Sequence, residues 1–255
     1  MYIFYKSHSL SNDFVIFDLN ENAITKKEFD QLIANRKILH KISNRYTGIG
    51  CDTIIAFEKI DMLTFKAYFW NMNGSEAKLC GNGLRCIALL LQQTRQLNKV
   101  KIKVENFVFE ASCEKGKVKV KYQNQALIRK VLTLTDAYHV DVGNEHIVLL
   151  RNEKLTDWHF IIEKIRQNFD DINVMWIYFD EQWKMQIFER GVGVTQACGS
   201  GALAAFNVLI QLNYVQNECE IIMQGGILHM KQEHDKSIVQ TGHACIVYKG
   251  EIELI

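Results

Sequence analysis

Short runs of alternating apolar and polar residues recur along the whole chain and predict a protein rich in β-strands. The runs are bounded by Gly, Asn or Lys. They cover residues 14–17, 53–57, 65–70, 100–104, 118–122, 147–150, 175–179, 185–188, 220–223, 238–240 and 244–248. Most of the chain is therefore expected to be strand.

Four longer stretches have the apolar spacing of amphipathic helices instead. They cover residues 26–42, 83–97, 156–169 and 201–212. Thr25 and Asp157 precede two of these stretches, and both are residue types that cap helix N-termini. A few well-separated helices among many strands are typical of the α+β class.

Two of the predicted helices begin with similar sequences. CGNGLRCIALLLQQ starts at Cys80, and CGSGALAAFNVLIQ starts 118 residues later at Cys198. The cysteine, both glycines and two later positions coincide, and a predicted strand precedes each segment. In a chain of 255 residues, a repeat at nearly half the length predicts two lobes of the same topology. We place these lobes at residues 1–116 and 117–246, with about residues 247–255 completing the first lobe.

Charge and composition narrow the class of partner. The 30 Lys and Arg residues nearly balance the 29 Asp and Glu residues, and the net charge is +1. This balance gives no electrostatic reason to expect a nucleic acid or an anionic membrane as partner, so we expect a small molecule. The apolar runs are far shorter than the ~20 residues of a membrane span, which predicts a soluble, cytoplasmic protein.

The cysteines point to thiol chemistry. Their number, seven, is odd, their spacing is wide, and no CxxC occurs. This pattern predicts reduced thiols, with neither a disulfide framework nor a zinc ribbon. The sequence also lacks the signatures of nucleotide-binding loops, zinc proteases and serine hydrolases.

The two CGxG segments could bind an anion and activate a thiol. Glycines at a helix N-terminus expose backbone N–H groups and the positive end of the helix dipole, which suits a carboxylate or a phosphate. The same dipole stabilises the thiolate of the preceding cysteine, so we expect the pKa of Cys80 and of Cys198 to fall toward neutrality or below. Core packing is not expected to require the paired glycines.

Two such helix starts on either side of one ligand would suit a proton transfer that inverts a stereocentre. One thiolate would remove a proton from a carbon, and one thiol would deliver a proton to the opposite face. A cysteine acting with a histidine as in a protease is conceivable, but nothing favours one nucleophilic cysteine over a pair. We expect the remaining cysteines to be small core residues. They are Cys51, Cys86, Cys113, Cys219 and Cys245.

These motifs resemble those of the diaminopimelate epimerase family, which are cofactor-independent amino-acid epimerases. The resemblance rests on NMNGSEAKLCGNGLRC (71–86) and ERGVGVTQACGSGALAA (189–205). The resemblance extends over essentially the whole chain, because further matching segments occur along it in the same order as in the family. These are HSLSNDF (8–14), RYTGIGCD (45–52), VGNEH (142–146) and INV (172–174).

The resemblance implies a fold and a reaction. It implies two similar lobes, each with a mixed or antiparallel sheet wrapped around a central helix, and an active site in the cleft between them. The reaction would convert L,L-diaminopimelate into meso-diaminopimelate in lysine and cell-wall precursor biosynthesis. Cys198 would be the base and Cys80 the acid, with no cofactor and no metal. A homodimer is also implied, with Tyr248 at its interface.

The resemblance further implies roles for individual residues. Backbone N–H groups of Gly81, Asn82, Gly199 and Ser200 would bind the carboxylate at the reacting carbon. Asn12, Asn144 and Glu189 would contact the substrate near its reacting amine. Asn71, Asn173 and Arg190 would bind the distal amino-acid end, and Thr53 would also contact the substrate. His146 and Glu189 would tune the cysteines.

The chain also departs from the family pattern, and alternatives stay open. Ser9, Ser11, Thr53, Glu145 and Val194 occupy positions where the family usually has other residues, and the stretch from about residue 125 to 142 is shorter. The asparagines could be turn formers, and Glu189 and Arg190 an exposed charge pair. A racemase of a different amino acid and a non-catalytic amino-acid-binding or thiol-redox protein are therefore the alternative functions.

Overall fold

The computed structural model describes residues 1–77, 79–123, 126–169 and 172–254. The chain forms two compact units, unit 1 with Met1–Val120 and Gly242–Ile255 and unit 2 with Lys121–Thr241. The sequence placed these boundaries at residues 116/117 and 246/247. Gln125, where the shortened stretch begins, lies outside the described residues.

Unit 1 is a sheet around a central helix, α3 (Gly81–Arg95). Strand β1 pairs antiparallel with β2 and β18, β2 pairs parallel with β3, and β3 pairs antiparallel with β4. Strand β4 pairs antiparallel with β5 and parallel with β6, and β6 pairs antiparallel with β7. The strands are β1 (Tyr2–Ser9), β2 (Asn12–Asp18), β3 (Thr53–Lys59), β4 (Thr64–Asn71), β5 (Glu76–Ala77), β6 (Lys99–Val104), β7 (Phe107–Glu114) and β18 (Cys245–Ile252), with β8 (Lys117–Tyr122) running into unit 2.

Unit 2 repeats this arrangement around α5 (Gly199–Gln211). Strand β10 pairs antiparallel with β11 and β9, β11 pairs parallel with β12, and β12 pairs antiparallel with β13. Strand β13 pairs antiparallel with β14 and parallel with β15, and β15 pairs antiparallel with β16, which pairs with β17. The strands are β9 (Leu127–Lys130), β10 (Ala137–Asp141), β11 (Glu145–Arg151), β12 (Asn173–Asp180), β13 (Gln182–Glu189), β14 (Gly193–Thr195), β15 (Glu218–Met223), β16 (Gly226–Gln232) and β17 (Ile238–Gly242).

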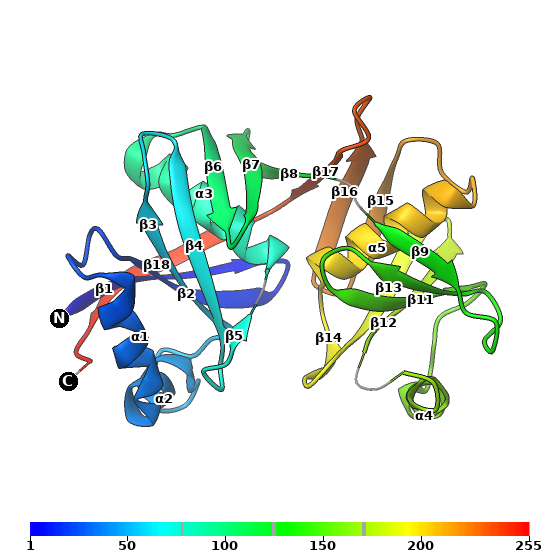
Figure 1. Ribbon diagram of the computed structural model, residues 1–255, viewed down its shortest axis with the longest axis horizontal. Coiled ribbons are helices and arrows are strands. Elements are labelled where there is room, and N and C mark those ends of the chain that lie inside the picture. Colours follow the sequence, from blue (N-terminus) through cyan, green and yellow to red (C-terminus); the bar gives the residue numbers. More distant parts are fainter. Residues whose placement is uncertain (78, 124–125, 170–171, 255) are drawn as a thin grey trace. The chain divides into compact units, whose positions relative to one another are not determined.

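The two units therefore share one topology, as the repeated CGxG segments predicted. In each unit the strands surround a largely buried helix (Figure 1). The α+β class and the two similar lobes are confirmed. The two sequence repeats also exchange one strand each. Strand β18, which comes after unit 2 in the chain, pairs with β1 of unit 1. Strand β9, which comes directly after the strands of unit 1 in the chain, pairs with β10 of unit 2.

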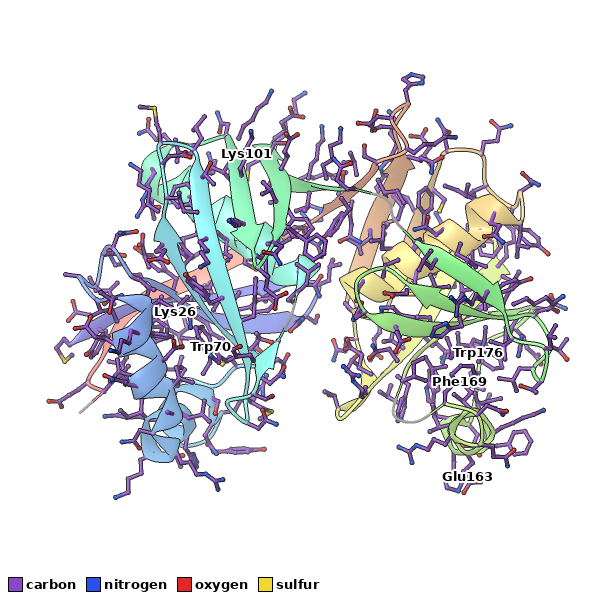
Figure 2. All side chains as sticks on the ribbon, viewed as in Figure 1. Lys26, Trp70, Lys101, Glu163, Phe169 and Trp176 are labelled. Atoms are coloured by element: carbon purple, nitrogen blue, oxygen red, sulfur yellow. The ribbon has the colours of Figure 1, made fainter. Side chains whose placement is uncertain are left out.

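A second helical layer covers the other side of each sheet. In unit 1 it consists of α1 (Lys26–Ala34) and α2 (Arg36–Ser43), and Phe29 of α1 packs against Phe17 and Trp70 with ring centroids 5.1 and 5.4 Å apart. Lys26 lies over the ring of Trp70 at 5.0 Å (Figure 2). In unit 2 the layer is α4 (Trp158–Arg166), whose Ile162 and Ile165 belong to the same buried cluster as Trp176.

The helix predictions need two corrections. The predicted helix 26–42 is two helices, because Asn35 has an extended backbone (φ −77°, ψ 111°) and its side chain caps α2 by accepting from the Lys37 N–H at 3.0 Å. The predicted helix 156–169 is shorter at both ends. Thr25 and Asp157 are confirmed as N-caps. The described part of the chain contains no helix that is both long and apolar enough to cross a membrane.

Candidate active site

The start of α3 places a thiol beside an amide side chain. Cys80 is the N-cap of α3, with an extended backbone (φ −131°, ψ 105°), and Gly81 and Asn82 form the buried first turn. Asn12, the first residue of β2, donates a hydrogen bond from Nδ2 to Cys80 Sγ at 3.7 Å. Four residues predicted for the site thus meet at one helix N-terminus.

The second glycine of each CGxG segment is required by packing, which corrects the sequence-based expectation. A Cβ atom on Gly83 would lie 2.7 Å from the Phe69 ring and 2.9 Å from Ile55 Cδ1. A Cβ atom on Gly201 would lie 2.2 Å from Met175 Sδ. These glycines therefore let the helix starts press against the sheet, and they hold each cysteine close to the neighbouring strands.

Arg85 is a polar residue of this site that the sequence analysis missed. Its side chain is fully buried, and it donates from Nε to Ser9 Oγ at 3.0 Å and from Nη2 to Asn82 Oδ1. Ser9 in turn donates to the His243 carbonyl at 2.7 Å. An arginine five positions after Cys80 in an apolar helix was the available clue.

Two further predicted residues of unit 1 face each other across adjacent strands. Thr53 begins β3, Asn71 ends β4, and the two are direct cross-strand partners. Thr53 is buried, whereas Asn71 is exposed and donates from Nδ2 to Ser75 Oγ at 2.9 Å. Tyr248, predicted for a dimer interface, is 46% exposed on β18 and packs edge-on against Phe4.

The start of α5 repeats the geometry of α3 in unit 2. Cys198 is the N-cap, and its Sγ accepts a hydrogen bond from the Gly201 N–H at 3.4 Å. Ser200 Oγ lies 3.5 Å from the same sulfur. The Gly199 carbonyl accepts from Gln240 Nε2 at 2.9 Å, which ties the first turn to β17.

The thiol of Cys198 has a raised pKa, contrary to the expectation from the helix dipole. Burial is the largest cause, and the negative charge of Glu189 adds to it. The contacts with Ser200 and the Gly201 N–H lower the pKa but do not offset these effects. Removing water outweighs the helix N-terminus at this buried position, so Cys198 is a neutral thiol in the unliganded protein.

His146 reaches Cys198 through two intervening side chains. Its Nε2 lies 2.9 Å from Asn144 Oδ1, and Asn144 Nδ2 donates to Ser200 Oγ at 3.4 Å. Because the amide oxygen accepts, Nε2 carries the proton in this arrangement. Burial lowers the pKa of His146 to about 4, so the ring is neutral at pH 7. His146 therefore orients Asn144 and Ser200 and contributes no charge.

Asn173 and Arg190 are joined at the ends of β12 and β13. Asn173 accepts from the Arg190 backbone N–H at 3.1 Å and donates to the Glu145 carbonyl at 3.0 Å. The Arg190 side chain is exposed, and Asn173 is buried. The amide of Asn173 thus fixes the backbone from which the arginine projects.

None of the seven cysteines, each of which is described, forms a disulfide. Cys51 and Cys86 are buried as predicted, and burial raises the pKa of each thiol to about 12. Cys113 and Cys219 are half-buried, and Cys245 is exposed on β18, so the prediction of a core position is wrong for Cys245. Among the described residues, no group of three or more His, Cys, Asp and Glu side chains is placed to hold a metal ion.

Comparison with known proteins identifies the family. The sequence model of the family described as diaminopimelate epimerase matches residues 4–128 and 138–247. The chain belongs to the diaminopimelate epimerase family. Members of this family are isomerases, and the matched segments include both cysteine motifs.

Curated relatives carry the same family name. The diaminopimelate epimerase of Rickettsia bellii (strain OSU 85-389) is 31% identical over 97% of this chain and 96% of its own length. That of Rickettsia prowazekii (strain Madrid E) is 32% identical over the same shares of the two chains. The likeness to diaminopimelate epimerases thus extends over nearly the whole of each protein.

Solved structures show that the fold is shared more widely than this family. A phenazine biosynthesis protein of the PhzF family from Bacillus anthracis superposes with a TM-score of 0.75 at 12% identity, over 99% of each chain. A probable proline racemase from Agrobacterium radiobacter K84 superposes with a TM-score of 0.72 at 10% identity, over 100% of this chain and 94% of that one. At such low identity these neighbours support the fold alone.

Proposed function

We propose that the chain epimerises L,L-diaminopimelate to meso-diaminopimelate by proton transfer between two cysteines. Cys198 takes the α-proton and Cys80 delivers a proton to the opposite face of the carbon. The observation that carries this proposal is the same in both units. In each, a cysteine is the N-cap of the buried central helix, so its thiol lies beside the backbone N–H groups of the first helical turn.

The helix starts suit the charge that develops in the reaction. Removal of an α-proton moves negative charge onto the substrate carboxylate, and N–H groups held at a helix N-terminus stabilise it. Gly81 and Asn82 supply these groups from α3, and Gly199 and Ser200 supply them from α5. The proposal requires both helix starts to reach one substrate.

The raised pKa of Cys198 fits a base that is activated by substrate. Glu189 raises the pKa of this thiol in the unliganded protein. A substrate ammonium group beside Glu189, Asn12 and Asn144 would neutralise that carboxylate and lower the thiol pKa. Deprotonation would then follow substrate binding, and the thiolate formed would be a strong base.

Recognition of the distal end separates diaminopimelate from other amino acids. Arg190 is an exposed guanidinium that can bind a second carboxylate, with Asn173 at its backbone and Asn71 as a further amide. Neutral amino acids and lysine lack this carboxylate and should be poor substrates. A racemase of another amino acid on the same scaffold is the alternative, and turnover of such a substrate at an equal rate would favour it.

The reaction is tested by hydrogen exchange at the α-carbon. L,L-diaminopimelate in D₂O should gain one deuterium at the inverted carbon, because the thiol that donates has exchanged with solvent. Mass spectrometry combined with chiral chromatography follows both products. Inversion without deuterium uptake would contradict the two-base scheme.

Matched cysteine variants assign the two roles. Cys80→Ala and Cys198→Ala should each reduce epimerisation by at least about a thousandfold, since each removes proton transfer on one face. Cys113→Ala is the control, because this half-buried thiol lies outside the proposed site. A near-normal rate in either of the first two variants would refute the scheme.

Three further properties belong to the proposal. The thiols and helix N–H groups provide acid, base and charge stabilisation, so no cofactor or metal is needed. Free thiol chemistry favours a reducing compartment, which is the cytoplasm.

We also expect a homodimer in which Tyr248 lies at the interface. Light scattering that compares Tyr248→Asp with the native chain tests this expectation.

A further inference from the structure

An ion cluster is formed by residues adjacent in the chain to two of the predicted substrate contacts. Asp13 follows Asn12 at the start of β2, and Asp52 precedes Thr53 at the start of β3. One nitrogen of Arg45, Nη2, lies 2.6 Å from Asp13 Oδ1 and 2.7 Å from Asp52 Oδ1. The guanidinium thus bridges the beginnings of two adjacent parallel strands.

The two carboxylates also hold each other's backbone. The Asp52 N–H donates to Asp13 Oδ1 at 2.9 Å, and the Asp13 N–H donates to Asp52 Oδ2 at 3.3 Å. Lys6 of β1 pairs with Asp13 Oδ2 and donates to the Gly50 carbonyl. The cluster therefore fixes the starts of β2 and β3 relative to each other and to the loop before β3.

Stability alone does not explain this arrangement. The side chains of Arg45 and Asp52 are 45% and 47% exposed, so this pair contributes little to folding, whereas Lys6 and Asp13 are 14% and 21% exposed. Two adjacent carboxylates also repel each other. Burial and the charge of Asp13 raise the pKa of Asp52, whereas Lys6 and Arg45 lower the pKa of Asp13 against the effect of burial.

We propose that Arg45 is a positioning residue for the epimerisation, which holds Asn12 against the Cys80 thiol by bridging Asp13 and Asp52. This inference rests on the proposed function. The Asn12 side chain donates to the thiol over 3.7 Å, which is long for a hydrogen bond, so a small shift of the β2 start weakens it. Thr53 follows Asp52 in the chain, so the same cluster positions its backbone. Misplacement of about an ångström is enough to slow an enzyme strongly.

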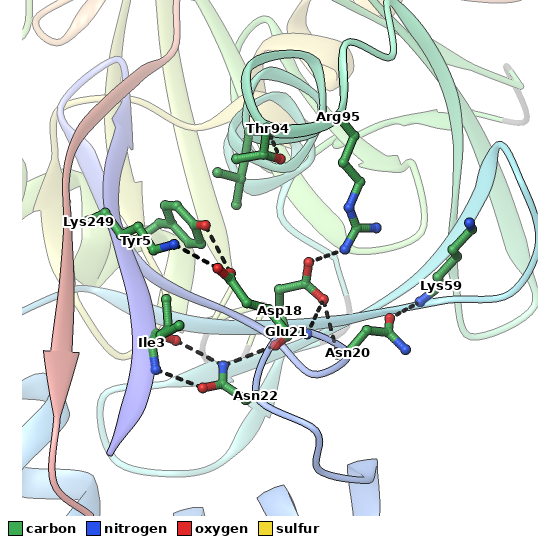
Figure 3. A network of polar contacts seen from close by, with 11 residues as sticks. Ile3, Tyr5, Asp18, Asn20, Glu21, Asn22, Lys59, Thr94, Arg95 and Lys249 are labelled. Carbon is green, nitrogen blue, oxygen red and sulfur yellow. Dashed lines mark hydrogen bonds and ion pairs between the residues drawn. The ribbon is translucent and has the colours of Figure 1, made fainter.

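The first test compares kinetic constants of three variants. Arg45→Met should lower kcat by roughly tenfold with a smaller change in KM, because the thiol is misoriented while the anion-binding turn stays. Arg45→Lys should retain more activity, since one nitrogen makes both contacts and an ammonium group can replace it. Arg95→Met is the matched control. It removes the ion pair with Asp18 at the other end of β2 (Figure 3) and should leave kcat unchanged.

The second test measures the alkylation rate of the Cys80 thiol and does not depend on catalytic turnover. Iodoacetamide alkylation followed by peptide mapping gives the rate at Cys80, and the buried Cys51 beside the cluster reports unfolding. Arg45→Met should change the Cys80 rate by roughly threefold or more while Cys51 stays unreactive.

The outcomes separate this inference from the proposed function. A native chain that fails to exchange the substrate α-proton overturns the proposed function, and the alkylation result still decides whether Arg45 positions Cys80. An unchanged Cys80 rate in Arg45→Met overturns the inference. A kcat loss equal to that of Arg95→Met, or one accompanied by alkylation of Cys51, also overturns it, because the role of Arg45 would then be structural only.

Discussion

At the scale of single residues, the proposed catalytic Cys198 shows how burial competes with the helix dipole. Cys80 and Cys198 are both helix N-caps, and the sequence predicted low pKa values for both. For Cys198, burial and Glu189 reverse that expectation. Burial depends on the whole unit and cannot be read from the CGSG segment alone, whereas the N-cap position could be.

Glu189→Gln should lower the pKa of Cys198. The substitution removes a negative charge that disfavours the thiolate and keeps the shape of the side chain. Alkylation of Cys198 in the unliganded protein should therefore begin at a lower pH than in the native chain. Alkylation of Cys113 provides the reference in the same sample. An identical pH profile in both proteins would show that Glu189 does not control this thiol.

His146→Gln should make stability less sensitive to acid. The pKa of His146 is about 4 when folded, against a usual 6.5, so the unfolded chain binds a proton that the native chain does not. The free energy of unfolding therefore falls as pH decreases from 6.5 to 4, by up to about 3 kcal/mol from this group. His146→Gln should lack this contribution to the pH dependence of the free energy of unfolding. Urea titrations between pH 7 and about 4.5 measure the difference, and equal slopes would contradict it.

At the scale of elements, the turn between β1 and β2 carries strain beside the site. Its two residues, Leu10 and Ser11, both have positive φ (54° and 67°). Such turns favour glycine. Asn12, which contacts the Cys80 thiol, follows at once.

Ser11→Gly should stabilise the protein by about 0.5–1 kcal/mol, because glycine adopts positive φ without a steric penalty. Ser112→Gly, on β7 where φ is negative, is the matched control and should destabilise by a similar amount. Urea midpoints of both variants test the pair. A loss of stability in Ser11→Gly would show that its hydroxyl has a role that outweighs the strain.

Periodicity predicted the elements that bury one clear face and missed those that do not. Helices α3 and α5, and strands such as β3 and β12, follow from apolar patterns in the sequence. The break at Asn35 was missed because asparagine is tolerated in a helix, and its capping role depends on the backbone around it. Strand β18 was shorter in the prediction because its residues are mostly exposed. The cluster of Asp13, Arg45 and Asp52 is assembled from distant segments, so no local pattern marks it.

At the scale of the whole molecule, the exchange of strands between repeats is the main feature of the topology. Strand β18 is held on unit 1 by β1 and by a polar network (Figure 3). In this network, Glu21 accepts from Tyr5 at 2.9 Å and from Lys249 of β18 at 2.7 Å.

Glu21→Gln should loosen β18 locally without unfolding the chain. The ion pair with Lys249 is partly exposed, so its loss should lower the free energy of unfolding by about 0.5–1 kcal/mol. Amide hydrogen exchange of residues 245–252 should accelerate by about two- to fivefold. Exchange in unit 2 should not change, and equal acceleration in both units would indicate a global effect instead.

The position of β18 also reverses the usual order in which domains are completed during synthesis. On a ribosome, N-terminal domains generally fold first. Here the sheet of unit 1 lacks a strand until residues 245–252 have been made, whereas strands β9 to β17 have all been translated by then. The first unit to begin is therefore the last to be finished. Until that moment β1 has an unpaired edge, which is a template for pairing with other chains.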